Sequence, residues 1–268
     1  MSLEMFGWIA LFGGLLLTLV AETLWPRYEW SHAARARHFV GNLALWVVVA
    51  AVLSMVAQYV LSPMLGVANA LNLGLLHRLD APFWLAATLG FLLADFSDYV
   101  FHRASHRFRT LWLLHAVHHS NPRLDASTSL RQHPFSYVPA LVIRLMLIIA
   151  LGAPAWSLVL RDVLAVISSH LHHAAISWSP RMIAWTERYL SWLIVPPTAH
   201  WLHHDPREEF TNSNYGQLLS CWDHIFGTYT PSTKTTSESG LSALSDSHWH
   251  TVQGLLQMPW RARRLPKL

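Results

Sequence analysis

Charged residues are scarce in this chain of 268 residues. Asp, Glu, Lys and Arg make up 13% of the sequence, whereas hydrophobic residues make up 53%. A soluble domain usually contains about 25% charged residues, so this composition excludes an ordinary soluble protein and predicts one that lies in a bilayer. The 14 tryptophans agree with that prediction, because the indole ring is favoured where apolar and aqueous environments meet.

Cysteine is nearly absent, and several cofactor motifs are missing. The single Cys221 excludes an internal disulfide framework, a cysteine zinc finger and an iron–sulfur cluster. The sequence also has no glycine fingerprint for a dinucleotide, no His-Glu-x-x-His motif of a zinc hydrolase, and no basic stretch interleaved with aromatic residues for nucleic acid. Imidazole is therefore the abundant metal ligand, and no nucleic-acid partner is expected.

The sequence contains several long apolar stretches. About 20 apolar residues cross the hydrocarbon core of a bilayer, and residues 5–25, 39–61 and 83–101 approach that length. The polar turn at 26–37 contains three arginines, whereas the expected loop at 62–82 contains a single one. The positive-inside rule places the first of these loops in the cytoplasm and the second on the far side.

Two shorter apolar stretches follow, at 135–151 and 155–167. Gly152 and Pro154 separate them, and each stretch contains one arginine. We expect a helical hairpin here, which either spans the bilayer with distortion or re-enters it. The fold class predicted from these patterns is an all-α membrane bundle of about four spanning helices with a cytoplasmic helical cap.

The histidines are unusually numerous and grouped. Residues three and four apart share one face of a helix, so histidines at such offsets can direct their imidazoles to one place. Eight of the 18 histidines follow these offsets, in three groups: His102 and His106; His115, His118 and His119; His200, His203 and His204. One transition-metal ion takes four to six ligands, so eight convergent imidazoles indicate two ions. We therefore place a dimetal site in the cap.

Further candidates lie near these groups. Asp98 is four residues before His102 and is expected to accept a hydrogen bond from its ring. His170 and His173 share a helix face, whereas His172 is adjacent to His173 and cannot point the same way. His133, which precedes Pro134, is a candidate for supporting a ligand or contacting the substrate.

The three histidine groups and the sequence around them resemble the fatty acid hydroxylase and sterol desaturase superfamily of integral-membrane di-iron oxygenases. The similar segments are Asp95-Phe-Ser-Asp-Tyr, Leu124-Asp-Ala-Ser-Thr, Arg131-x-His-Pro, Asn214-Tyr-Gly and Trp222-Asp-x-x-Phe-Gly-Thr, and together they span residues 85–229. The resemblance adds His173 to the eight ligands and gives Asn214 a supporting role. Family members have Ala-Asn after this histidine, and here Ala174 and Ala175 stand there.

The resemblance also implies a division of the chain and a reaction. Residues 1–82 hold membrane spans, 83–229 form the catalytic domain, and 230–268 are a loop and a tail. The Ser/Thr-rich composition predicts a mobile loop, and the basic residues of the tail predict contact with the membrane surface. Residues 182–195 have the pattern of a helix in the membrane interface. The implied reaction is O2-dependent hydroxylation or desaturation of an unactivated C–H bond of a membrane lipid, at two Fe ions for which zinc can substitute in purified protein.

Electrons for such a reaction would come from a separate ferredoxin, cytochrome or reductase, because no nucleotide, haem or iron–sulfur motif is present. The lipid could be a sterol, a fatty acyl chain, an alkylglycerol or a carotenoid. Three alternatives stay open. A metal transporter would have its histidines within the spans, a zinc hydrolase would act without oxygen or reductant, and an inactive relative would have lost one of the groups.

Overall fold

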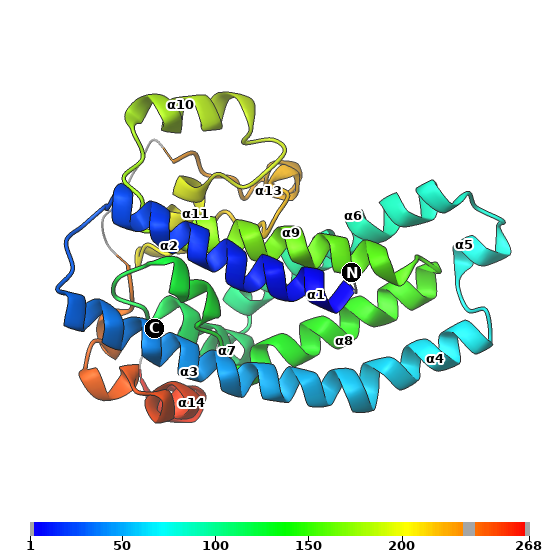
Figure 1. Ribbon diagram of the computed structural model, residues 1–268, viewed down its shortest axis with the longest axis horizontal. Coiled ribbons are helices and arrows are strands. Elements are labelled where there is room, and N and C mark those ends of the chain that lie inside the picture. Colours follow the sequence, from blue (N-terminus) through cyan, green and yellow to red (C-terminus); the bar gives the residue numbers. More distant parts are fainter. Residues whose placement is uncertain (1–2, 233–238, 266–268) are drawn as a thin grey trace.

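The computed structural model describes residues 3–232 and 239–265. Within these residues the regular elements are helices, joined by one isolated bridge between Pro26 and Ile176. The predicted all-α membrane bundle is thereby confirmed. Figure 1 shows long helices running side by side toward one end of the molecule, with short helices gathered at the other.

Two long helical segments form the N-terminal part. The first consists of α1 (Leu3–Trp8), a π-helical turn (Ile9–Gly13) and α2 (Gly14–Leu24). The second consists of α3 (His32–Val56), a π-helical turn (Ala57–Leu61) and α4 (Ser62–Ala70), and the short α5 (Leu75–Arg78) follows. Ser31 caps α3, because its hydroxyl accepts a hydrogen bond from the backbone N–H of Ala34.

The expected loop at 62–82 is wrong over its first half, where the chain is helical. Pro63 lies in the first turn of α4, directly after the π-helical turn. Proline has no backbone N–H, so one intrahelical hydrogen bond is missing where the π-helical turn joins α4. The chain turns only at Asn72 and Gly74, which both have positive φ angles.

The centre of the bundle is formed by α6 (Phe83–Arg107), α8 (Pro134–Leu151) and α9 (Ala155–His173), which pack together. The turn between α8 and α9 lies against α5. A Cβ atom added at Gly74 would be 2.2 Å from the Cα of Gly152, so the two backbones touch only because both residues are glycine.

The arginines in the two apolar stretches pair with aspartates of α6. Arg161 Nη2 lies 3.0 Å from Asp95 Oδ1, and Arg144 Nη1 lies 2.9 Å from Asp98 Oδ2. Arg161 also contacts Asp98. These pairs connect α6, α8 and α9 and explain how the hairpin tolerates its charges, because an ionised side chain inside a bundle needs a partner.

Three helical segments in the described chain are long and apolar enough to cross a membrane: His32–Arg78, Phe83–Arg107 and Pro134–Leu151. A shorter apolar segment is Ile9–Leu24. The prediction of about four crossings includes this shorter segment.

Short helices form the cap at the other end. They are α7 (Arg109–His119), a 3-10 turn (Ala126–Leu130), α10 (Pro180–Tyr189), α11 (Pro197–His203), α12 (Glu208–Thr211) and α13 (Cys221–Ile225). The helix expected at 182–195 ends at Tyr189. It has no buried residues and lies apart from the bundle in Figure 1.

The C-terminal segment packs into the cap and is not a free tail. Residues 233–238 of the predicted mobile loop lie outside the described residues. The part that follows contains 3-10 turns at Ser242–Leu244 and Ser247–His250, the helix α14 (Val252–Arg261) and a last turn at Ala262–Arg264. Leu255 and Met258 of α14 are fully buried in one cluster with Leu113 and Val117 of α7.

Candidate metal centre

The nine histidines proposed as ligands come from four helices whose ends converge. The end of α6 supplies two, α7 supplies three, the end of α9 supplies one, and α11 with the residue after it supplies three. In that order they are His102, His106, His115, His118, His119, His173, His200, His203 and His204. All except His106 are buried.

The nine side chains form two groups, in each of which the ligand atoms lie within 4.8 Å of one another. Group one is His102, His106, His115, His119 and His203, and group two is His118, His173, His200 and His204. The groups adjoin, because the rings of His119 and His204 stack with centroids 4.5 Å apart.

Each histidine triad is divided between the two groups, which differs from the expectation that a triad points to one place. His115 and His119 of α7 enter group one, whereas His118 enters group two. The triad of α11 divides in the opposite sense, with His203 in group one. Neighbouring residues of a helix differ by about 100° in direction, so adjacent histidines face different centres.

The hydrogen bonds of group two test whether a cation fits there. Nδ1 of His118 lies 3.2 Å from the carbonyl oxygen of Arg131, and Nδ1 of His173 lies 2.6 Å from that of Ser169. A carbonyl can only accept, so both Nδ1 atoms carry the proton of the neutral ring and both Nε2 atoms have lone pairs. These Nε2 atoms lie 3.0 Å apart. Two facing lone pairs repel each other unless a cation lies between them, so the residues fit a metal ion.

Group one has the same design. Nδ1 of His102 lies 2.8 Å from the carbonyl oxygen of Tyr215, and Nδ1 of His203 lies 2.7 Å from that of Ser213. The Nε2 atoms of His203 and His106 are buried and have no hydrogen-bond partner in the described part of the chain. A metal ion with bonds of about 2.1 Å would satisfy these atoms, and ligands around one ion lie roughly 3 Å apart, as Nε2 of His102 and His115 do at 3.0 Å.

Burial keeps the cap histidines neutral. It lowers the pKa of His119, His200 and His204 well below the ordinary value, and neighbouring imidazoles lower it further. The pKa of His118 is lowered in the same way, although its hydrogen bond to Arg131 opposes the shift. A neutral imidazole is the form that binds a metal, so the site needs no deprotonation at neutral pH.

The loop before α13 holds the two carbonyls that orient His102 and His203. Asn214, which has a φ of 53°, donates from Nδ2 to the carbonyls of Ala199 and Thr230 and accepts from the backbone N–H of Thr230. The carboxylate of Asp223 accepts hydrogen bonds from the backbone N–H groups of Tyr215 and Gly216 at 2.8 Å each. Asn214 is therefore placed to support the site.

The expected hydrogen bond between His102 and Asp98 is wrong. The ring of His102 uses the carbonyl of Tyr215, and the carboxylate of Asp98 is occupied by Arg144 and Arg161. Sequence spacing alone suggested the contact, since the two residues are one helical turn apart. Ion pairs with these two arginines direct the carboxylate of Asp98 toward α8 and α9.

Three other candidate histidines lie outside the two groups. His170 contacts Ser129 Oγ and the carbonyl of Leu11, and His133 caps α8 and contacts the carbonyl of Leu256. His172 contacts the carbonyl of Val195, and its ring stacks on that of His200 with centroids 5.1 Å apart. His172 therefore supports a member of group two from behind.

Arg131 is a supporting residue whose role sequence reasoning missed. Its buried guanidinium donates to the carbonyl of Val117, to Ser120 Oγ and to His250 Nδ1. Burial lowers its pKa to about 9. The Arg-x-His-Pro motif was noticeable in the sequence, but His250, from the far C-terminal segment, had no recognisable signal.

At Ala175, where the resembling family has asparagine, the backbone makes the hydrogen bond to a neighbouring element. The N–H groups of Ala175 and Ala126 both donate to Glu22 Oε1, at 2.8 and 2.6 Å. Glu22 also pairs with Arg35. This carboxylate therefore joins α2, the end of α9 and the 3-10 turn beside the site.

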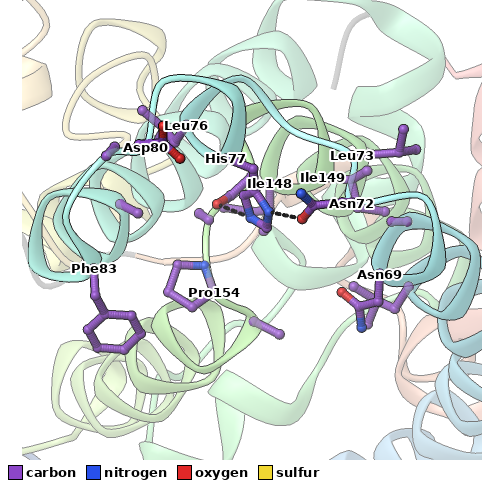
Figure 2. A pocket seen from close by; sticks show the side chains of 17 residues that line it. Asn69, Asn72, Leu73, Leu76, His77, Asp80, Phe83, Ile148, Ile149 and Pro154 are labelled. Carbon is purple, nitrogen blue, oxygen red and sulfur yellow. Dashed lines mark hydrogen bonds between the residues drawn. The ribbon is translucent and has the colours of Figure 1, made fainter.

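Two cavities flank the bundle. One of about 1000 Å³ reaches the ring of His106 and is lined by residues of α6, α7, α12 and the α13 loop. The other, of about 580 Å³, lies at the opposite end, between α5 and the α8–α9 turn. In Figure 2 His77 points into this second cavity and bonds Asn72 Oδ1 and the carbonyl of Gly152. Only the first cavity adjoins the candidate metal centre.

The fold and the site define a class: a membrane-spanning helical protein with two adjoining histidine clusters, each of which could hold a metal ion. The chain belongs to the fatty acid hydroxylase family, because the family model, described as fatty acid hydroxylase, matches residues 87–228, which is more than half of the chain.

Curated relatives agree with this assignment. Alkylglycerol monooxygenase is 30% identical in Danio rerio, over 58% of this chain and 33% of the relative, and 29% identical in Homo sapiens, over 56% and 31%. Ornithine lipid hydroxylase of Rhizobium tropici is 26% identical over 60% of this chain and 47% of its own. The chain thus spans a third to a half of these relatives. No solved structure matches it.

Proposed function

We propose that this protein is an O2-dependent membrane lipid hydroxylase with two iron ions at the candidate metal centre. The observation that carries the proposal is the pair of facing Nε2 atoms of His118 and His173, which are 3.0 Å apart and both have lone pairs. Such an arrangement is stable with a cation between the rings. Family membership and the names of the relatives favour hydroxylation of a lipid over desaturation.

The roles of the residues follow from the site. Group one and group two would each hold one ion, and the ions would supply the power to activate O2 and oxidise a C–H bond. The carbonyls of Tyr215, Ser213, Arg131 and Ser169 fix the ring orientations, so the lone pairs are aligned before the metal binds. Burial of the other eight rings keeps water away from these ligands, whereas His106 borders the cavity.

The other components of the reaction come from outside this chain. The lipid would reach group one through the cavity beside His106. A ferredoxin, cytochrome or reductase would supply electrons. We place the metal centre on the cytoplasmic side, because the arginine-rich turn at 26–37 and the segment 103–131 are at the same end of the bundle.

Isotope labelling with a metal analysis tests the proposal. We expect about two irons per chain, and a lipid product that carries oxygen from ¹⁸O2 when a reductase system is supplied. Substituting His118→Ala should reduce the metal content and abolish the labelled product while the protein still inserts. A product that forms without oxygen and takes its label from water would show a hydrolase, and would overturn the proposal.

A further inference from the structure

The cavity beside His106 has a graded lining along one face of α6. Phe96, Val100, Arg103 and Arg107 all line it, and their spacing of four, three and four residues places them on one side of the helix. The face is therefore apolar toward the middle of the span and cationic at its end. The centres of the two regions are about 10 Å apart along the helix axis, at 1.5 Å per residue.

Aromatic rings continue the apolar part of this lining to the metal centre. Phe226 stacks on Phe96 and on Tyr99, with centroids 5.8 and 5.5 Å apart. At the other end, the ring of His106 lies between Tyr215 and Trp112, at 5.2 and 5.0 Å. His106 is the one histidine of the nine that is only partly buried, so the cavity gives access to group one at this ring.

The cationic end has few counter-charges. Within the described residues no ion pair joins Arg103 or Arg107 to an acidic side chain, and Arg103 donates to the hydroxyl of Tyr99 at 3.4 Å. Arg109 also lines the cavity and donates to the carbonyls of Arg263 and Leu265. Glu208 is the acidic residue in the lining, so positive charge exceeds negative charge there.

We propose that this cavity binds a lipid with an anionic headgroup, whose phosphate or carboxylate contacts Arg103 and Arg107 and whose chain lies along Phe96 and Val100. This inference rests on the proposed function for the reaction but not for the binding. A cavity of about 1000 Å³ with aromatic walls and a few placed charges is typical of a small-molecule site. The guanidinium groups supply the planar donors that phosphate and carboxylate prefer.

The position of His106 also orients the lipid. His106 lies on α6 between Arg103 and Arg107, whereas Phe96 is about 15 Å further along the helix. A lipid held by its headgroup at the arginines therefore places its first few carbons beside group one and its chain end far from it. The oxidised position lies near the headgroup.

Binding to the protein as purified, with no reductant present, tests the site without depending on activity. Native mass spectrometry in a neutral detergent would count bound dioleoyl phosphatidate, oleate and neutral dioleoylglycerol. We expect preference for the anionic lipids, and the better of the two identifies the headgroup as phosphate or carboxylate. The double variant Arg103→Gln/Arg107→Gln should weaken anionic binding roughly tenfold and leave dioleoylglycerol unchanged, because it removes charged hydrogen bonds only.

Two further variants locate the effect. Arg181→Gln/Arg188→Gln removes the same charge from the exposed helix α10 and should leave binding unchanged. Val100→Trp narrows the chain region and should weaken all three lipids. The proposal is overturned if Arg103→Gln/Arg107→Gln binds anionic lipid normally. If this variant binds lipid normally but slows reduction of the protein by an acidic electron-donor protein, the arginines bind that donor and the proposal is likewise overturned.

The active, metal-loaded protein tests the orientation. Fragmentation of the oxidised lipid should place the new oxygen within the first few carbons from the headgroup. Oxygen near the methyl end would contradict the orientation. Loss of all oxidation with normal anionic binding would instead contradict the proposed function, so the two failures are distinguishable.

Discussion

Two backbone carbonyls, those of Ser213 and Tyr215, set the protonation of His203 and His102. A ring that donates from Nδ1 has its lone pair on Nε2, so these carbonyls decide which atom faces the metal. Asn214 lies between these two residues, and its side chain fixes the loop through three hydrogen bonds. The geometry of group one therefore depends on a residue that contacts no ion.

Replacing this asparagine should release the loop. Asn214→Ala removes the three hydrogen bonds and leaves alanine at a φ of 53°, so we expect a loss of about 2–4 kcal/mol of stability and of metal from group one. Thermal unfolding and metal analysis measure the two effects. Asn72→Ala is the matched control, because Asn72 has a φ of 46° but is exposed at the far end of the bundle. Equal metal content in both variants would contradict the role given to Asn214.

The residue scale shows what spacing can and cannot predict. Offsets of three and four residues indicated that the histidines share helix faces, and the structure does bring the nine side chains together. The offsets could not indicate that His118 and His119 serve different groups, because that depends on how α7 crosses α11. Likewise, the partner of Asp98 depends on Arg144 and Arg161, which are far away in sequence.

At the scale of elements, α7 is held in place by the C-terminal helix. Leu255 and Met258 of α14 are fully buried against Leu113 and Val117 of α7. The adjacent His250 accepts a hydrogen bond from Arg131, whose own carbonyl orients His118. The C-terminal segment thus supports both groups, although it contributes no candidate ligand.

Shortening a side chain of α14 should therefore disturb the metal centre from a distance. Leu255→Ala leaves a cavity against α7, and we expect a loss of about 2–5 kcal/mol with reduced metal occupancy. Gln257→Ala, on the exposed face of the same helix, is the control and should change neither quantity. Unfolding monitored by circular dichroism, with metal analysis, separates the cases. An intact stability of Leu255→Ala would show that α14 does not support α7.

Some helices and turns could be predicted from the sequence and others could not. The hairpin of α8 and α9 was predicted because Gly152 and Pro154 interrupt two apolar runs. The helical course of 62–70 was missed because the apolar stretch was taken to end at residue 61, whereas the helix continues through the π-helical turn into α4. The burial of α14 was missed because its basic residues suggested a membrane-surface tail, and its apolar face is only a few residues long.

At the scale of the whole molecule, the protein is a bundle with its chemistry at one end. Helices α6 and α9 carry candidate ligands at their C-terminal ends, and α7 and α11 approach from the cap (Figure 1). Because the ligands come from segments far apart in sequence, the centre exists only when the bundle is assembled. Metal binding to these groups would therefore be thermodynamically linked to folding.

This linkage predicts how the stability of the metal-free protein depends on pH. The folded-state pKa values of His200, His203 and His204 are far below 6.5, chiefly through burial. As the pH falls below about 6.5, the unfolded chain binds protons that the folded protein does not, so the free energy of unfolding decreases. At pH 5.5 each such histidine should cost about 1.4 kcal/mol relative to pH 8. Unfolding of metal-free protein in detergent at pH 8, 6.5 and 5.5 measures this loss. Bound metal should raise the stability at pH 8 and be released as the pH falls, whereas a stability independent of pH between 8 and 5.5 would show that these histidines are not held neutral.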